Sequence, residues 1–427
     1  MSTELLIPSL VGEGSFDNEL SPETMTAILE QALEVIAPGE RVLAIVPDKT
    51  RDDNTDFLFP IAVRVFGERN LKSFDTLVAQ GTHPPMSTEQ KLSKLGLDHF
   101  AGTLFDHRWD RPEDLITIGE LSGDHVSELT AGLITDSVSV SLNKLLAPGI
   151  YDTVLIFGAT VPHEVAGFAG GAKYFFPGVA GPELTHMTHW LGALAGIENI
   201  IGRVETPTRR LIEAAADFVT ARIISLNTVV SRNDDGRLVT YALFGGDVRE
   251  AFRRAAEVSR RIHIRYTGRK YRRVVAVLDR HYDEMWVGGK ASYKLGAIIE
   301  DGGELIIFAP HLTKLSETHG ALIEKYGYAP LESVRDMLGA SQELRENLCI
   351  AAHLAHVAYA GRIDETGKVV ARYQITMATS INEATCQRVN LGYVDYHDLN
   401  WETLRADADT LIVENAGRDL YKVGVNN

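Results

Sequence analysis

Three clusters of polar residues follow apolar runs that the sequence predicts to be strands. They are D-K-T-R at 48–51, G-T-H at 81–83 and P-H-E at 162–164. In an open α/β sheet the ligand crevice lies beyond the carboxyl ends of the strands. We therefore expect His83, His163 and Arg51 to converge in one cleft. Each cluster also has a structural explanation, because Asp48 could cap the following helix and Arg51 could be an exposed surface cation.

A glycine-rich segment with a single lysine, G-F-A-G-G-A-K-Y-F-F-P-G at 167–178, follows the third cluster. It matches the phosphate loop of ordinary ATPases poorly, because Ala172 precedes Lys173 and Tyr174 takes the place of the metal-binding hydroxyl, although a nucleotide phosphate could still bind here. Apolar and aromatic neighbours would disfavour the charged form of Lys173 and make its amine nucleophilic. Glycines at 167, 170 and 171 would let a bulky group approach the backbone. A lysine attached covalently to a cofactor fits both features, and an exposed loop lysine is the alternative.

Two histidines, His186 and His189, lie three residues apart on a helical pattern that begins after Pro182. They share one helix face, and imidazole is a ligand for nickel, zinc or copper. Two histidines do not complete a zinc site with four protein ligands, and the sequence has no HExxH motif and no CxxC pair. A metal at this position would need a non-protein ligand for most of its coordination.

The composition indicates a soluble globular protein with an acidic balance. The 427 residues suggest two domains, and the formal net charge is -16, from 42 basic and 58 acidic residues. This charge disfavours nucleic acid or an anionic membrane as the main partner but not a small anionic substrate. With two cysteines, no signal-peptide pattern and no apolar run of ~18 residues, we expect a cytoplasmic protein.

Short runs rich in Val, Ile and Leu alternate with helical patterns, which predicts an α/β protein with mostly parallel sheets. The predicted strands are 41–48, 73–83, 151–160, 272–280, 303–310 and 408–417. A helix is predicted over 54–70, beginning near its proline. The most basic stretch, 253–273, separates the N-terminal units from the later strands, and a linker is predicted near 262–270.

These ordered motifs resemble those of the nickel-dependent lactate racemases and related 2-hydroxyacid racemases and epimerases. The shared elements are D-x-T-R at 48–51, G-T-H at 81–83 and P-H…G-F-x-G-G-x-K…P-G at 162–178. A weaker fourth match, to a Q-x-x-K element, places Lys290 at the family's lysine. Val287 stands where that element has glutamine, which leaves the substrate open, and Lys294 is a competing candidate.

The resemblance implies a nickel pincer nucleotide, the pyridinium-3-thioamide-5-thiocarboxylic acid mononucleotide of nickel, attached covalently to Lys173. In the family a ring carbon, two sulfurs and one histidine bind the nickel. By motif position this histidine resembles His189, with His186 as the fallback. The further residues assigned to cofactor binding are Asp48, Thr50, Gly170 and Gly171. Since separate enzymes make this cofactor, cofactor-biosynthesis enzymes are expected partners.

The resemblance also implies the reaction. His83 and His163 resemble the family's acid–base pair, one for each enantiomer, and imidazole exchanges protons near neutral pH. Arg51 would bind the substrate carboxylate, and Lys290 would face the substrate. The expected activity is reversible hydride transfer from a small 2-hydroxyacid, lactate-like or larger and possibly a sugar acid, through a 2-keto acid.

By the same resemblance, a first domain spans 1–265 and takes back the C-terminal tail 405–427. A second spans 270–404, and the active site lies in the cleft between two α/β domains. One alternative function is a metallohydrolase with zinc bound by histidines, and Glu164 as the adjacent carboxylate. Another is a non-catalytic cofactor carrier, which would not need acid–base histidines. The sequence makes no prediction of the oligomeric state.

Overall fold

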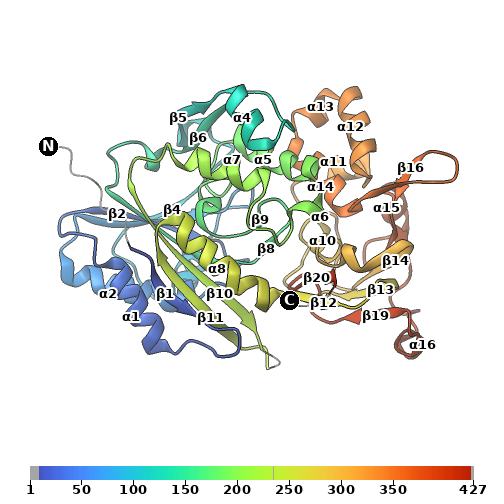
Figure 1. Cartoon of the computed structure of the whole chain (residues 1–427), viewed down its shortest axis with the longest axis horizontal. Coiled ribbons are helices and arrows are strands. Elements are labelled where there is room, and N and C mark those ends of the chain that lie inside the picture. Colours follow the sequence, from blue (N-terminus) through green and yellow to red (C-terminus); the bar gives the residue numbers. More distant parts are fainter. Residues whose placement is uncertain (1–8, 234, 425–427) are drawn as a thin grey trace. The chain divides into compact units, whose positions relative to one another are not determined.

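The computed structural model describes residues 9–233 and 235–424, which divide into two compact units (Figure 1). Unit 1 takes the described residues of Met1–Thr188 and Arg203–Ile262, and unit 2 those of His189–Gly202 and His263–Asn427. The division after Ile262 falls at the start of the predicted linker. The expected α/β class with mainly parallel sheets is confirmed.

Unit 1 is built on a seven-stranded sheet in the order β1-β11-β10-β7-β2-β3-β4. The strands are β1 Val11–Gly14, β2 Arg41–Pro47, β3 Ser73–Ala79, β4 Leu104–Asp106, β7 Thr153–Ala159, β10 Arg222–Arg232 and β11 Leu238–Gly246. Those from β10 to β4 run parallel, and β11 and β1 add an antiparallel edge. The chain passes from β2 to β3 on one side, whereas β7 and β10 lie on the other. The strand order therefore reverses between the parallel neighbours β2 and β7. Ligand crevices form at such a switch point in open α/β sheets.

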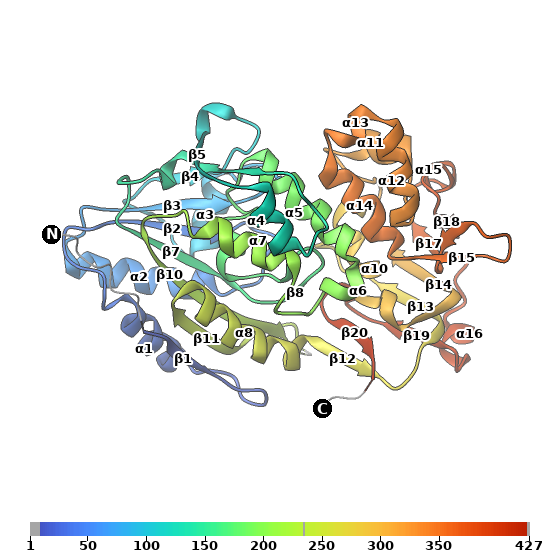
Figure 2. The same ribbon diagram turned by 45° about the horizontal axis from the view of Figure 1, so that its top comes forward.

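Helices cover both faces of this sheet, and α1 and α2 lie side by side on one of them (Figure 2). Leu243 of β11 packs with these helices, whereas its neighbour Phe244 packs with α8 on the opposite face, as alternating side chains of a strand must. The helices are α1 Pro22–Leu33, α2 Thr55–Arg69, α3 Thr88–Leu95, α4 Gly123–Thr130, α5 Pro182–Ala195, α7 Pro207–Ala216 and α8 Val248–His263. Short elements complete the unit: η1 Pro112–Asp114, η2 Lys144–Leu146, η3 Gly171–Tyr174, the pair β5 Leu115–Leu121 and β6 Val138–Asn143, and the pair β8 Pro162–His163 and β9 Gly167–Phe168.

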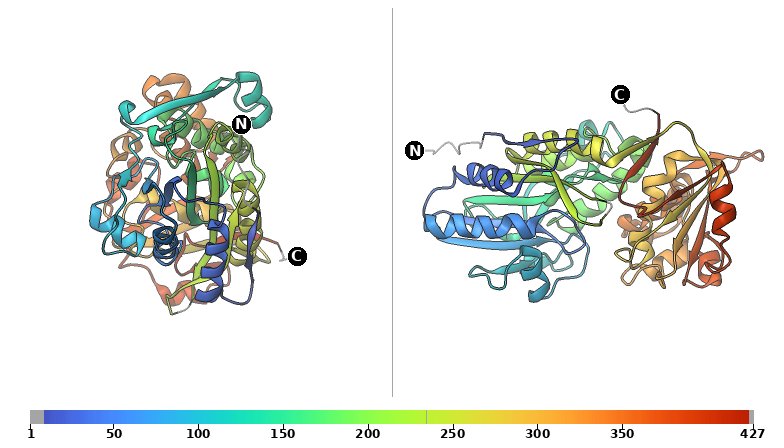
Figure 3. Two further views of the ribbon diagram at one scale, coloured as in Figure 1. Left: turned by 90° about the vertical axis from the view of Figure 1, so that its left-hand side faces the viewer. Right: turned by 90° about the horizontal axis from the view of Figure 1, so that it is seen from below.

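Unit 2 contains a five-stranded parallel sheet in the order β18-β17-β14-β13-β19, seen in the right-hand view of Figure 3. The strands are β13 Tyr271–Val277, β14 Ile299–Ala309, β17 Gln374–Thr379, β18 Gly392–Tyr393 and β19 Thr410–Val413. The remaining strands are β12 Ile264–Thr267, β15 Gly361–Ile363, β16 Val369–Ala371 and β20 Leu420–Val423. The helices are α6 Ile197–Ile200, α9 Met285–Gly288, α10 Lys290–Leu295, η4 Gly296–Ile298, α11 Gly320–Tyr326, α12 Leu331–Ala340, α13 Gln342–Arg345, α14 Leu348–Ala358, α15 Glu383–Arg388 and α16 Trp401–Ala406. In the described part of the chain, no helix combines the length and the apolar character needed to cross a bilayer.

Each predicted strand has a counterpart, namely β2, β3, β7, β13, β14 and β19. The predicted helix 54–70 is α2, but it does not begin near its proline, because Pro60 lies inside it. Its start is fixed instead by Asp53, whose carboxylate accepts the N–H of Thr55 at 3.0 Å, and by the Asn54 carbonyl, which accepts the N–H of Leu58. The helix therefore tolerates the loss of the one backbone hydrogen bond that Pro60, which has no N–H, cannot donate.

The C-terminal tail differs from its prediction. Residues 405–427 were expected to return to the first domain, but their described part lies in unit 2. There β19 joins the main sheet beside β13, and β20 pairs with β12. These pairings give the backbone N–H and C=O groups of β19 and β20 hydrogen-bond partners. Residues 189–202 also belong to unit 2, because Ala193, Ile197 and Ile201 pack into its core.

A cluster of aromatic rings anchors α2 to the sheet of unit 1. Phe59 is fully buried, and its ring centroid lies 5.2 Å from that of Phe74, 5.4 Å from that of Phe100 and 5.7 Å from that of Phe157. We expect Phe59→Ala to lower the free energy of unfolding by about 3–5 kcal/mol, because it removes these contacts and leaves a cavity. The measurement is amide hydrogen exchange in β2 and β7.

The matched control is Ile150→Ala in the same unit, where the side chain is 45% exposed and the change should stay within about 0.5 kcal/mol. Equal effects of the two substitutions would show that the aromatic cluster does not stabilise the sheet.

Candidate functional site

The candidate site begins at the carboxyl ends of β2, β3 and β7. Asp48 directly follows β2, and His83 lies four residues beyond the last residue of β3. His83 Nδ1 lies 2.6 Å from Asp48 Oδ2. Asp48 is only 5% exposed, whereas the His83 side chain is 27% exposed, so a buried carboxylate contacts a partly exposed imidazole.

The second oxygen of Asp48 is also occupied. Oδ1 accepts a hydrogen bond from the Thr50 N–H at 2.9 Å and another from the Thr50 hydroxyl at 2.5 Å. Burial alone would raise the pKa of Asp48. The hydrogen bond from His83, the charge of His83 when its imidazole is protonated, the charge of Arg51 and the Thr50 hydroxyl outweigh burial and hold this pKa well below its usual value. The carboxylate is therefore ionised at neutral pH, and it orients His83 rather than capping α2.

A buried ion pair that the sequence did not reveal fixes the backbone beside Arg51. Asp53 is 2% exposed, and its two carboxylate oxygens lie 2.9 and 2.8 Å from Lys94 Nζ. The same ammonium donates to the carbonyl of Arg51 at 2.6 Å. The Arg51 guanidinium itself makes no hydrogen bond or ion pair to another described residue, so its donors can bind an anion.

His163 lies in a short antiparallel turn where β8 pairs with β9. Its Nδ1 accepts a hydrogen bond from the N–H of Val165 at 3.1 Å, and the Glu164 carboxylate lies 3.8 Å from the same nitrogen. The environment of this imidazole thus differs from that of His83, whose Nδ1 faces a carboxylate. The chain supplies two imidazoles at this edge of the sheet, held by different partners.

The glycine-rich segment is held by two buried side chains that sequence reasoning missed. Arg209 donates to the carbonyls of Gly170 at 3.2 Å and Phe168 at 2.5 Å, and Asn227 Oδ1 accepts the N–H of Gly171 at 3.0 Å. The guanidinium also lies 3.9 Å from the centre of the Phe252 ring. Burial lowers the pKa of Arg209 to about 10, so it remains charged at neutral pH.

The glycines of this segment accommodate the chain itself. Gly170 and Gly171 have φ values of 98° and 59°. A Cβ on Gly170 would lie 2.5 Å from the Thr160 hydroxyl, and one on Gly171 would lie 2.9 Å from Phe252. We expected these glycines to admit a bulky ligand, but the space on this side is filled by the fold. Their assignment to cofactor binding stays a prediction.

Lys173 is half-buried in η3, and Tyr174 follows it. The tyrosine hydroxyl lies against Gly158 of β7, where a Cβ would come within 1.9 Å of it. Burial, with the charges of Asp53 and Asp48, raises the pKa of Tyr174 well above its usual value. The tyrosine therefore fixes η3, and with it Lys173, against the end of β7.

A backbone hydrogen bond connects the lysine loop to the G-T-H turn. The Gly81 N–H donates to the Gly178 carbonyl at 2.9 Å, and the Gly178 N–H donates to the Lys173 carbonyl at 3.2 Å. The segments that carry His83 and Lys173 are therefore held together within unit 1.

The other predicted residues lie on α5 and in unit 2. His186 faces Trp109 with 6.0 Å between ring centroids, and burial lowers its pKa. His189 lies on the same helix, α5, in the part that belongs to unit 2. Lys290 begins α10, with Nζ 5.7 Å from the ring centre of Tyr282, whereas Lys294 is buried.

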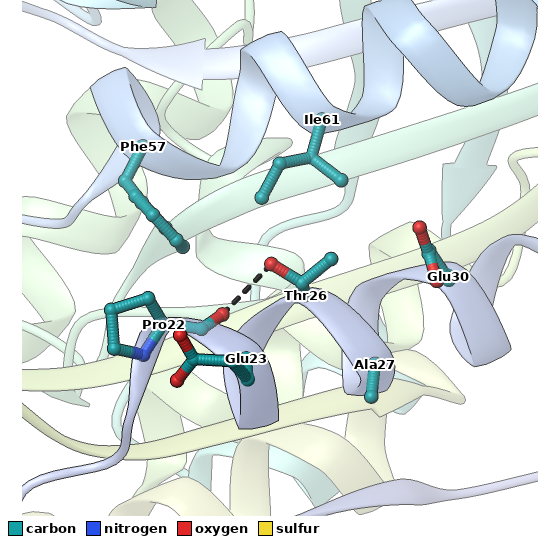
Figure 4. A pocket seen from close by; sticks show the side chains of 7 residues that line it. All are labelled: Pro22, Glu23, Thr26, Ala27, Glu30, Phe57 and Ile61. Carbon is teal, nitrogen blue, oxygen red and sulfur yellow. Dashed lines mark hydrogen bonds between the residues drawn. The ribbon is translucent and has the colours of Figure 1, made fainter.

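Among residues 9–233 and 235–424, no three His, Cys, Asp or Glu side chains form a group that could hold a metal ion. This gives no support to a metallohydrolase, which needs such a group. A pocket of about 420 Å³ lies between α1 and α2 (Figure 4), but none of the predicted site residues lines it.

A buried neutral histidine braces the far end of the lysine loop. His107 is 1% exposed, and its Nε2 donates to the carbonyl of Ala180 at 2.9 Å. Burial lowers the pKa of His107 to about 4. Between about pH 6.5 and pH 4 the unfolded chain binds a proton that the folded chain does not. The contribution of His107 to the free energy of unfolding therefore decreases as the pH drops through this range. At 1.36 kcal/mol per pKa unit, the loss is up to roughly 3 kcal/mol.

We expect the free energy of unfolding of the His107→Gln variant to depend less on pH than that of the parent chain. The glutamine amide can still donate to the Ala180 carbonyl, but it does not titrate. The measurement compares urea-unfolding free energies of the variant and the parent at about pH 7 and about pH 4.5. The same acid-induced loss in both proteins would contradict the buried neutral imidazole.

Comparison with known proteins agrees with this architecture. The family described as the lactate racemase N-terminal domain matches residues 23–199. The crystal structure of a Thermotoga maritima protein aligns with 96% of this chain and 100% of its own, at 33% identity and a TM-score of 0.86. The lactate racemase apoprotein from Thermoanaerobacterium thermosaccharolyticum shares the fold over 93% of each chain, at 18% identity and a TM-score of 0.71.

No match is found among curated proteins. The family match nevertheless covers all three strand-end motifs and the lysine loop, and the similarity of fold extends over nearly the whole chain. The chain belongs to the lactate racemase family.

Proposed function

We propose that the chain is a nickel-pincer-nucleotide-dependent racemase or epimerase of a 2-hydroxyacid. Membership of the lactate racemase family supports a racemase or epimerase, and so an isomerase. The observation that supports the finer proposal is the hydrogen-bonded connection between the loop of Lys173 and the turn of His83. It ties the backbone of the segment that carries Lys173 to the backbone of the turn that carries His83.

The described residues fit such a cofactor. Lys173 would form the covalent bond, His189 would be the protein ligand of nickel, and His186 is the alternative ligand. A metal that a cofactor holds through carbon and sulfur needs only one protein side chain, so the lack of a larger ligand group among the described residues is compatible with it. When bound, the cofactor supplies an acceptor and donor of hydride.

The chain's own residues would bind the substrate and move its proton. Arg51 would bind the carboxylate by paired N–H donors, since its guanidinium has no other partner among the described residues. Lys290 would contact the substrate. His83 and His163 would exchange the hydroxyl proton at their Nε2 atoms, because a racemase must act on hydroxyl groups in two orientations. Asp48 supports the reaction through His83, since both of its oxygens are occupied.

The proposed substrate is a small 2-hydroxyacid, lactate-like or larger. Val287 at the position of the family's glutamine favours a pocket that differs from that of lactate racemase. Cofactor-biosynthesis enzymes are the proposed partners, and the cytoplasm is the proposed location.

The proposal predicts that Lys173→Ala loses nickel and racemisation together when the chain is produced with the cofactor-biosynthesis enzymes. Lys173→Arg should lose both as well, because a guanidinium keeps the charge but cannot form the thioamide. The measurements are nickel per chain and racemisation of a panel of 2-hydroxyacids. Lys144→Ala, at a 53% exposed side chain of the same unit, is the control and should retain both. Full nickel content and activity in Lys173→Ala would refute the proposal.

A second prediction separates acid–base residues from metal ligands. His83→Ala and His163→Ala should keep nickel but lose racemisation by about 10²–10⁴-fold, the usual contribution of a general acid or base. Nickel content and activity are measured on the same preparations. Loss of the metal from both variants would identify these histidines as ligands instead.

A further inference from the structure

The two imidazoles of the candidate site differ in what their Nδ1 atoms contact. His83 Nδ1 lies 2.6 Å from Asp48 Oδ2, and an ionised carboxylate can only accept a hydrogen bond. Nδ1 of His83 must therefore carry a hydrogen. His163 Nδ1 lies 3.1 Å from the N–H of Val165, and a backbone N–H can only donate. Nδ1 of His163 must therefore present a lone pair.

A neutral imidazole carries one hydrogen, so the partner of Nδ1 decides the state of Nε2. With its hydrogen on Nδ1, His83 has a lone pair on Nε2 and can accept a proton there. With a lone pair on Nδ1, His163 has its hydrogen on Nε2 and can donate a hydrogen bond there. The two neutral side chains are therefore opposite tautomers.

We propose that the two histidines are not interchangeable in the resting protein: His83 is the general base, and His163 is a hydrogen-bond donor to the substrate oxygen. This inference rests on the proposed function. The hydroxyl proton passes to Nε2 of His83, and the electron pair of the O–H bond forms the C=O bond. The proposed cofactor, when bound, would supply the acceptor for the C2 hydrogen, which would leave as hydride. The resulting imidazolium keeps its Nδ1–H on Asp48.

His163 can become a base only after a local rearrangement. A hydrogen on its Nδ1 would face the N–H of Val165, so that hydrogen bond must break first. The Glu164 carboxylate lies 3.8 Å from Nδ1, beyond hydrogen-bond distance. His83 needs no such change, because Asp48 accepts its Nδ1–H in both protonation states.

Asp48 acts here as a positioning residue. Its Oδ1 accepts both donors of Thr50, which leaves Oδ2 for His83. In Asp48→Asn the amide oxygen should keep the place beside Thr50, because only an acceptor fits there. The amide N–H would then face His83 Nδ1 and donate to it. This substitution should reverse the tautomer of His83 and leave that of His163 unchanged.

The direct test is two-bond proton–nitrogen NMR of the full chain labelled with ¹⁵N in histidine, without cofactor. At about pH 8.5, two units above the ordinary histidine pKa, neutral tautomers are distinguished by their nitrogen shifts. Comparison with His83→Gln and His163→Gln assigns the signals. We expect Nδ1–H in His83, Nε2–H in His163, and reversal of His83 alone in Asp48→Asn.

The same tautomer in both residues, or a charged His83 at this pH, would overturn the inference, and so would an unchanged His83 signal in folded Asp48→Asn. If that variant does not fold, the spectrum of the parent chain alone decides. These readouts do not depend on the cofactor. A chain that carries no cofactor and racemises nothing would refute the proposed function instead.

Activity of the loaded protein tests the assigned roles. The side-chain amide in His163→Gln can place an N–H close to the position of Nε2–H, whereas the one in His83→Gln is not a base. We expect His163→Gln to retain at least about tenfold more racemisation than His83→Gln, whose loss should reach 10²–10⁴-fold. Equal losses in the two variants would contradict the assignment of unequal roles.

Discussion

The candidate site depends on one buried carboxylate. Asp48 sits where β2 ends, with little access to water, and a charge in such a place must be compensated by hydrogen bonds and opposite charge. Thr50 occupies one oxygen and His83 the other, while Arg51 contributes positive charge nearby. The same contacts that keep the carboxylate ionised therefore orient the imidazole.

The topology of the sheet explains why this carboxylate meets the lysine loop. β2 and β7 are parallel neighbours, but the next strand after β2 is added on one side of the pair and the next sheet strand after β7 on the other. The segments that follow β2 and β7 therefore border the crevice at this switch point. The loop after β7 is then fixed by hydrogen bonds to Arg209 and Asn227 and by the contact of Tyr174 with Gly158. A flexible lysine would lose conformational freedom on binding a cofactor, whereas a loop held in this way has already lost most of it.

Local pattern predicted much of this arrangement. Apolar runs marked β2, β3 and β7 because parallel strands are buried on both faces, and the polar residues after them marked the edge where side chains meet. The start of α2 was predicted too late in the chain. Hydrogen bonds to Asp53 and Asn54 begin the helix at Thr55, although Pro60 then lies inside it. The tail was misplaced, because pairing of β20 with β12 is a long-range choice that no local pattern records.

The partners of the site residues could not be predicted for the same reason. Asp48 and His83 are 35 residues apart, and Lys94 and Asp53 are 41 apart, so their pairing follows only from the fold. Arg209 looked like any charged residue on a helix, although it is buried under the glycine-rich segment. Its signal in the sequence was weak, since an arginine is seldom fully buried and nothing local indicates when it is.

The central claim is that the amine held at the end of β7 carries a cofactor. The most direct measurement is the mass of the proteolytic peptide that contains Lys173, taken from chain produced together with the enzymes that make the cofactor. The account predicts an added mass of several hundred daltons, confined to that lysine and absent from chain produced without those enzymes. An unmodified Lys173 peptide from nickel-containing, active protein would contradict it.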